Sequence, residues 1–113
     1  MSALMSWFHV GPEGNLPLNA GIAAWVDGTP VAIFDLGTLG LYGIDNRDPA
    51  SGVGVLARGL ICDMQGSLCV ASPLYKQHFR LSDGVCLEDA ALNTQVFEVK
   101  KQDGQVFVRA KAA

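Results

Sequence analysis

Residues 95–109 read Gln-Val-Phe-Glu-Val-Lys-Lys-Gln-Asp-Gly-Gln-Val-Phe-Val-Arg, and this stretch decides the fold class. Gln95–Lys100 and Gln105–Arg109 each divide into two faces at a period of two: Val96, Glu98 and Lys100 against Phe97, Val99 and Lys101, then Val106 and Val108 against Phe107 and Arg109. Alternation with a period of two is typical of a half-buried strand. Asp103–Gly104 between the two runs indicates a tight turn, because glycine accepts the positive φ angle that hairpin turns require. The stretch predicts an antiparallel hairpin.

The same rhythm of short apolar runs and glycine-bearing turns extends back to the N-terminus. It predicts an all-β fold, a sandwich or small barrel, with one short helix at most, near Leu87–Leu92. A chain of 113 residues suits a single domain, 1–113. The other expected strands are Trp7–Val10, closed by Gly11–Pro12, then Gly21–Val26, Pro30–Asp35, Leu39–Ile44, Leu60–Asp63, Leu68–Ala71, Phe79–Leu81 and Val85–Leu87.

Charge and composition exclude several classes of function. The net charge of −3 argues against nucleic-acid binding, which depends on clustered lysine and arginine. The longest apolar runs are far shorter than a bilayer-spanning helix, so no membrane association is expected. Residues 1–10 contain no basic region followed by a long apolar run, so they do not resemble a signal peptide, and a cytoplasmic protein is predicted.

Few residues suit catalysis. Neither His9 nor His78 lies in a pattern typical of nucleophilic enzymes, and the glycine-bearing turns open no helix that would bind phosphate. Acidic pairs occur in two loops, Asp45 with Asp48 and Glu88 with Asp89, where solvated carboxylates are the ordinary interpretation. No catalytic residue is predicted.

The three cysteines, Cys62, Cys69 and Cys86, favour free thiols over a disulfide framework, since their number is odd. Cys62 and Cys69 are expected to face each other across the Met64–Ser67 turn. Their spacing lacks the short ligand pairs of structural zinc sites. An alternative remains open at this point, an electron-transfer protein with an unusual cluster on these cysteines and His78.

Two loops, 45–59 and 72–78, interrupt the strand rhythm, and both resemble the cluster loops of Rieske iron–sulfur proteins. Residues 71–84, Ala-Ser-Pro-Leu-Tyr-Lys-Gln-His-Phe-Arg-Leu-Ser-Asp-Gly, are similar to the second cluster loop, with Pro73, Phe79 and Gly84 matching. Residues 41–50 are similar to the stretch leading into the first. The resemblance implies a Rieske-like fold whose cluster-binding subdomain corresponds to about 45–84.

The ligand positions of this resemblance hold other residues. Asp48 and Ser72 stand where the cysteines would be, and Ala50 and Tyr75 where the histidines would be. A Rieske [2Fe–2S] centre needs two thiolates and two imidazoles. Hard oxygen atoms, a methyl group and a phenol do not replace them. We therefore expect no iron–sulfur cluster, no other cofactor and no metal in this chain.

Within the Rieske-like proteins, Ser-Pro-Leu-Tyr-Lys-Gln-His-Phe and Cys-Leu-Glu-Asp resemble the small subunit of bacterial cytoplasmic NAD(P)H-dependent nitrite reductase. The resemblance implies a non-catalytic accessory subunit of an oxidoreductase of nitrogen metabolism and nitrate assimilation, which reduces nitrite to ammonium. It implies that FAD, an iron–sulfur cluster and sirohaem are bound by a large partner subunit. Nothing in the sequence supports the remaining alternative, a stand-alone enzyme or ligand-binding protein.

The resemblance also implies where the partner binds, because Rieske domains meet redox partners at the cluster tip. Arg47, Lys76 and His78 are the candidate interface residues, with ordinary solvated charges as the alternative for Arg47 and Lys76. For His78, a local hydrogen bond to loop backbone is expected. Tyr75 is expected to fill the volume that a cluster would occupy.

Overall fold

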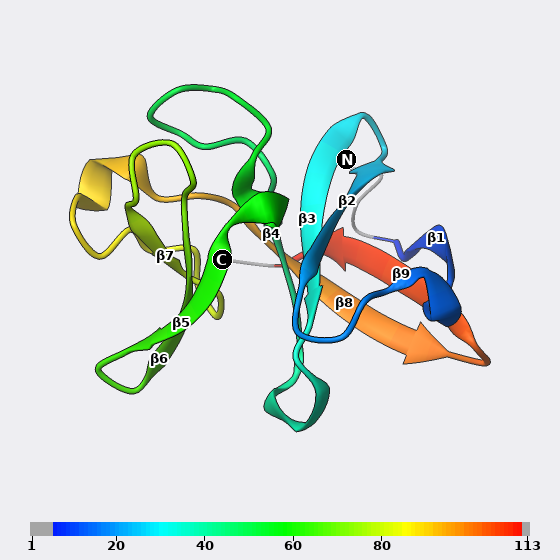
Figure 1. The fold of residues 1–113 in the computed structure, drawn as a ribbon. Coiled ribbons are helices and arrows are strands. Elements are labelled where there is room, and N and C mark those ends of the chain that lie inside the picture. The colour runs from blue at the N-terminus through cyan, green and yellow to red at the C-terminus, as the bar shows by residue number, and fades with distance from the viewer. Residues whose placement is uncertain (1–5, 112–113) are drawn as a thin grey trace.

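The computed structural model describes residues 6–111, which form nine strands and four single turns of 3-10 helix. Figure 1 shows a larger curled sheet beside a smaller one. The strands are β1 (Phe8–Pro12), β2 (Gly21–Val26), β3 (Thr29–Asp35), β4 (Leu41–Asp45), β5 (Leu60–Met64), β6 (Ser67–Ala71), β7 (His78–Arg80), β8 (Val96–Gln102) and β9 (Gln105–Ala110). The 3-10 turns are Glu13–Asn15, Gly37–Leu39, Leu56–Arg58 and Ala90–Leu92. The all-β prediction is confirmed.

Three two-residue turns build the hairpins, at Asp27–Gly28, Gln65–Gly66 and Asp103–Gly104. Both residues of each turn have positive φ angles, for example +54° and +76° at Asp103 and Gly104. This is the type I′ geometry whose twist matches that of the flanking strands. The turn residues therefore fix the register of three strand pairs.

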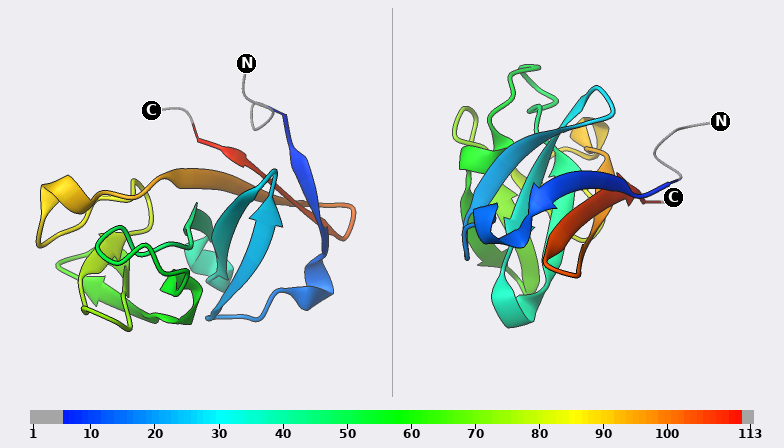
Figure 2. Two further views of the ribbon diagram at one scale, coloured as in Figure 1. Left: turned by 90° about the horizontal axis from the view of Figure 1, so that it is seen from above. Right: turned by 90° about the vertical axis from the view of Figure 1, so that its right-hand side faces the viewer.

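The larger sheet has the strand order β1-β9-β8-β4-β3-β2 and curls into an incomplete barrel (Figure 2). All of its strand pairs are antiparallel. β3 lies between β2 and β4 and is buried along most of its length. Val31 and Ile33 enter one apolar cluster with Val26, Phe97 and Val108.

The opposite face of β3 builds the second apolar cluster. Ala32 and Phe34 pack there with Val70 and Phe79 of the smaller sheet, β5-β6-β7, and with Leu56. Successive side chains of a strand point to opposite faces, so this one strand serves both clusters. The smaller sheet is attached to the barrel by this shared core.

Two local expectations about strands need correction, and the expected short helix is present. Val85–Leu87 forms no strand, since only a single bridge joins Phe79 to Cys86. The first strand does not close at Gly11–Pro12 but continues through it, with a shift in register between His9 and Gly11. The expected helix is one 3-10 turn, Ala90–Leu92. Within residues 6–111, no helix is long and apolar enough to cross a membrane.

Candidate functional site

The first loop (46–59) connects β4 to β5 and is held by buried polar groups. The Asn46 side-chain oxygen accepts a hydrogen bond from the Ala57 amide at 2.7 Å, and the Asn46 amide donates to the carbonyl of Pro30 at 2.8 Å. The Asp48 carbonyl accepts hydrogen bonds from the amides of Ser51 and Gly52. Backbone donors and acceptors inside the loop are thereby paired, as buried peptide groups require.

The second loop (72–77) connects β6 to β7 and is built on Ser72. The Ser72 amide donates to the carbonyl of Gln77, and the Ser72 carbonyl accepts from the amide of Lys76, both at 2.9 Å. The residues inside this turn are open to solvent. Leu74, Tyr75 and Lys76 are all exposed, and Lys76 has a φ angle of +62°, which is unfavourable for a residue with a side chain.

The two loops meet at Asp48 and Ser72, two of the positions that the sequence resemblance aligns with cluster ligands. The Ser72 hydroxyl donates a hydrogen bond to one carboxylate oxygen of Asp48, and the other oxygen accepts from the Ala50 amide at 2.8 Å. Both side chains are almost fully buried. Where a Rieske protein would have two thiolates, this chain has a buried hydrogen bond that joins the loops.

The four positions do not fit a Rieske cluster. Asp48 and Ser72 are committed to each other, the Ala50 side chain offers no ligand atom, and Tyr75 is 60% exposed. The expectation that Tyr75 fills the volume of a cluster is wrong, because its ring lies in solvent. The tip is closed by two small polar residues, and the aromatic side chain is left on the surface.

The three candidate interface residues differ in how they are paired. The Arg47 guanidinium binds both carboxylate oxygens of Asp45, at 3.0 and 2.6 Å. The His78 ring contacts the Glu88 carboxylate at 2.6 Å, and the same carboxylate accepts from the His78 amide at 2.7 Å. The expectation that the His78 ring would hydrogen-bond to loop backbone is therefore wrong, because its partner is the Glu88 carboxylate. Lys76 has no side-chain partner within residues 6–111.

Glu88 is the residue that sequence reasoning missed, since it was interpreted as a solvated loop acid. Partial burial raises its pKa, but the hydrogen bonds from the amide and ring of His78 outweigh burial and leave the pKa below its ordinary value. The other acid of that pair, Asp89, accepts from the Ala91 amide at the start of a 3-10 turn. The Cys-Leu-Glu-Asp motif was a signal that could have pointed to both.

The cysteines lie below the tip, and the expectation that Cys62 and Cys69 face each other is confirmed. All three thiols are free. Burial raises the pKa of Cys62, and it raises the pKa of Cys69 to about 11, which disfavours the thiolate form that binds metals. Within the described part of the chain, no three His, Cys, Asp or Glu residues are grouped so that they could hold a metal ion. The alternative of an unusual cluster gains no support.

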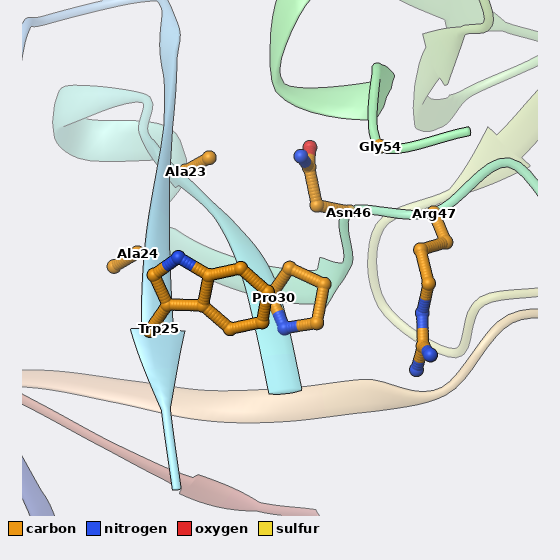
Figure 3. Close-up of a pocket in the computed structure, with 7 residues that line it drawn as sticks. All are labelled: Ala23, Ala24, Trp25, Pro30, Asn46, Arg47 and Gly54. Carbon is orange, nitrogen blue, oxygen red and sulfur yellow. The ribbon is translucent and has the colours of Figure 1, made fainter. Parts of the chain in front are cut away.

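Two pockets flank the first loop. One, of about 360 Å³, lies against β2, and in Figure 3 the Trp25 ring lies beside Pro30 while Arg47 occupies the opposite side. Its lining is Ala23, Ala24, Trp25, Pro30, Asn46, Arg47 and Gly54. The other, of about 300 Å³, lies between the two loops and is lined by Arg58, Gly59, Leu60, Ala71, Ser72, Pro73, Lys76 and His78.

Comparisons with known proteins agree on one group. A family model described as Rieske-like [2Fe–2S] domain matches residues 6–109. The nitrite reductase (NADH) small subunit of Escherichia coli K12 is 44% identical over 107 residues, which cover 94% of this chain and 99% of that protein. The NMR structure of the E. coli protein NirD superposes with a TM-score of 0.84 at 38% identity, covering 95% of this chain and 98% of that one.

A further relative has a different organisation. The nitrite reductase [NAD(P)H] large subunit of Klebsiella oxytoca is 39% identical over 102 residues, which cover 90% of this chain but only 11% of that longer protein. A domain similar to this chain is therefore part of a large-subunit polypeptide in that organism.

Proposed function

Because the chain belongs to the Rieske-like [2Fe–2S] domain family, and within it to the small subunits of nitrite reductase, we propose that it is the accessory subunit of an NAD(P)H-dependent nitrite reductase. It binds a large subunit that reduces nitrite to ammonium. The proposal rests on the 44% identity to the E. coli small subunit, which extends over nearly the full length of both chains. The Klebsiella relative supports the pairing, since there a similar domain and a large subunit share one polypeptide.

The chain itself binds no Rieske cluster in this proposal. The support is chemical, because the hydrogen-bonded pair of Asp48 and Ser72 replaces the thiolates, and neither Ala50 nor Tyr75 offers an imidazole. FAD, an iron–sulfur cluster and sirohaem are assigned to the large subunit, and the complex is cytoplasmic. Residues 45–84 are the counterpart of a cluster-binding subdomain and act as a binding surface.

The partner docks on the tip. Val53 of the first loop and Leu74 and Tyr75 of the second are large apolar side chains that are 45–60% exposed. Arg47 lies on the first loop, Lys76 directly follows Tyr75 on the second, and His78 follows the second loop. An apolar centre with a polar rim is the usual composition of a protein interface.

Copurification tests the docking proposal. The large subunit is expressed with a tagged copy of this chain, and the amount recovered and the nitrite-dependent oxidation of NAD(P)H are both measured. We expect Leu74→Asp combined with Tyr75→Asp to reduce recovery at least tenfold. Leu39→Asp is the matched control, since Leu39 is 59% exposed and lies beyond the other end of β4. Equal recovery of the tip variant and the control would rule out docking through the tip.

Iron analysis tests the absence of a cluster. After anaerobic purification we expect a colourless chain with iron and sulfide far below one equivalent. Stoichiometric iron and sulfide with visible absorption would instead favour the electron-transfer alternative. A Cys62→Ser variant of a coloured protein would then show whether the thiols below the tip are the ligands.

A further inference from the structure

The cations of this chain are almost all paired within it. Of the eight lysines and arginines, four form ion pairs, one lies 4.4 Å from the centre of the Trp7 ring, and one donates to the carbonyl of Ser82. These six are Arg47, Arg80, Lys101, Arg109, Lys100 and Lys111. Within residues 6–111, the side chains that have no such partner are those of Arg58 and Lys76. Both are exposed, and both line the pocket of about 300 Å³ between the two loops.

Close backbone packing brings these two cations to one pocket. A Cβ atom on Gly59 would lie 2.3 Å from the carbonyl oxygen of Ala71, so the end of the first loop abuts the start of the second. Arg58 precedes this contact. Lys76 is on the second loop, in the left-handed backbone conformation described above. Unfavourable backbone angles persist where surrounding structure enforces them, and they are common at binding sites.

The rest of the pocket lining suits the aliphatic part of a charged side chain. Leu60 is 77% exposed at the pocket, and Pro73 is exposed beside it. His78 also lines the pocket, although its ring is occupied by Glu88. Arg58 and Lys76, which have no ion-pair partner among residues 6–111, form a local positive site on a chain of net charge −3, and such a site attracts and orients an acidic partner.

We propose that this pocket binds an acidic side chain of the large subunit, whose carboxylate is held by Arg58 and Lys76. Arg58 is the main anchor, because its planar guanidinium can bind both oxygens of a carboxylate. Arg47 does not line this pocket, and Asp45 already binds its guanidinium. The inference rests on the proposed docking of a large subunit, and it names the contact that gives the docking its specificity.

Equilibrium binding between the intact large subunit and the isolated small-subunit chain tests the proposal. We expect Arg58→Glu and Lys76→Glu each to raise Kd at least tenfold, and Arg58→Lys to raise it by a smaller factor, because the forked geometry is lost. Lys100→Glu is the matched charge-reversal control, since Lys100 lies on β8 outside the pocket lining, and it should change Kd less than threefold. Thermal melting of each variant checks that the fold is retained.

The salt dependence of binding gives a second measurement. Kd of the unmodified chain should rise as sodium chloride increases, and the slope should be shallower for Arg58→Glu, since one charge contact is removed. Arg58→Gln provides the same test without introducing a negative charge.

The possible outcomes separate this inference from the proposed function. If Arg58→Glu and Lys76→Glu bind like the unmodified chain while the Leu74 and Tyr75 variant does not, the tip docks but the carboxylate pocket is wrong. If the unmodified chain itself fails to bind, the proposed function is wrong. If nitrite binds the isolated chain and Arg58→Glu abolishes only that binding, the pocket is a small-anion site and the proposal is overturned.

Discussion

The first loop and the second loop form one tip, but their polar groups are used in different ways. In the first loop Asn46 and Asp48 are buried and hydrogen-bonded, and the charge of Arg47 is neutralised by Asp45. In the second loop Lys76 has no such partner within residues 6–111, and its neighbours Leu74 and Tyr75 are exposed. The Gln77 side-chain oxygen is buried without a hydrogen-bond partner in the described structure. The polar groups from Asn46 to Asp48 are satisfied internally, whereas Lys76 of the second loop and Arg58 at the end of the first can still bind a partner.

The contrast matters because a polar group whose hydrogen bonds are already made inside the fold has little capacity left to bind a partner. A carboxylate that is already hydrogen-bonded gains little from a second partner, whereas an unpaired cation gains a new interaction when a carboxylate arrives. Substitutions of the buried, paired groups Asp48 and Ser72 should therefore change stability, and substitutions of Lys76 and Arg58 should change binding.

The largest expected effect is on the contact that joins the loops. Asp48→Ala should lower the free energy of unfolding by about 2–4 kcal/mol, since the Ser72 hydroxyl and the Ala50 amide lose their acceptor in a buried site. Ser72→Ala should cost less, about 1–2 kcal/mol. Urea denaturation measures both, and the double variant should lose less than the sum because the residues share one contact.

Tyr75→Ala is the matched control for this prediction. Its side chain is exposed on the second loop, so its effect should stay within about 0.5 kcal/mol. A loss of stability for Tyr75→Ala equal to that for Asp48→Ala would remove the distinction between the two loops.

A smaller and opposite effect is expected at Lys76. Lys76→Gly should raise the free energy of unfolding by about 0.5 kcal/mol, because glycine relieves the positive φ angle but adds freedom to the unfolded chain. Lys76→Ala removes the same charge and keeps the strained backbone, so it should not stabilise the fold. Chemical denaturation distinguishes the two variants. Stabilisation by Lys76→Ala equal to that by Lys76→Gly would mean that the lysine charge, and not the backbone angle, is unfavourable.

The smallest effect concerns Glu88, whose carboxylate binds the amide and the ring of His78, the first residue after the second loop. Its pKa is lower in the folded chain than its ordinary value of about 4.5, so its contribution is present above that pH and is lost as the pH falls through the folded pKa. Because the Glu88 side chain is 45% exposed, Glu88→Gln should cost below about 0.5 kcal/mol at pH 7. At a pH below the folded pKa of Glu88, the variant and the unmodified chain should unfold alike. A difference that persists there would show a packing effect unrelated to charge.

Strand positions were predictable from sequence wherever a hairpin turn fixed both ends. Gly21–Val26 is a strand with the predicted bounds, and the runs around Asp103–Gly104 pair as expected, because alternation and turn geometry are local properties. The prediction of a strand at Val85–Leu87 was wrong because strand formation there depends on tertiary contacts. A short apolar run becomes a strand only if a neighbouring strand has free hydrogen-bonding groups, and only one bridge to β7 is available.

At the tip, the sequence resemblance predicted four ligand positions, but not the hydrogen bond that the structure has between two of them. That Asp48 and Ser72 bond to each other depends on two loops 24 residues apart meeting in space. The exposure of Tyr75 was missed, since a large aromatic residue at a vacated position suggests filling. Arg58 was recognised only as part of a matching segment, because its lack of a side-chain partner within residues 6–111 depends on the tertiary structure.

The position of β3 has a consequence for how the molecule unfolds. Its alternate side chains belong to the barrel cluster on one face and to the cluster beneath the tip on the other. Neither cluster can melt without exposing half of this strand, so we expect the barrel and the smaller sheet to open in one cooperative step rather than as separate foldons. The amides of β3 would then exchange with solvent only through global unfolding. Because the tip shares its core with β3, we expect its backbone to be ordered before a partner binds. Binding should then cost the tip little conformational entropy.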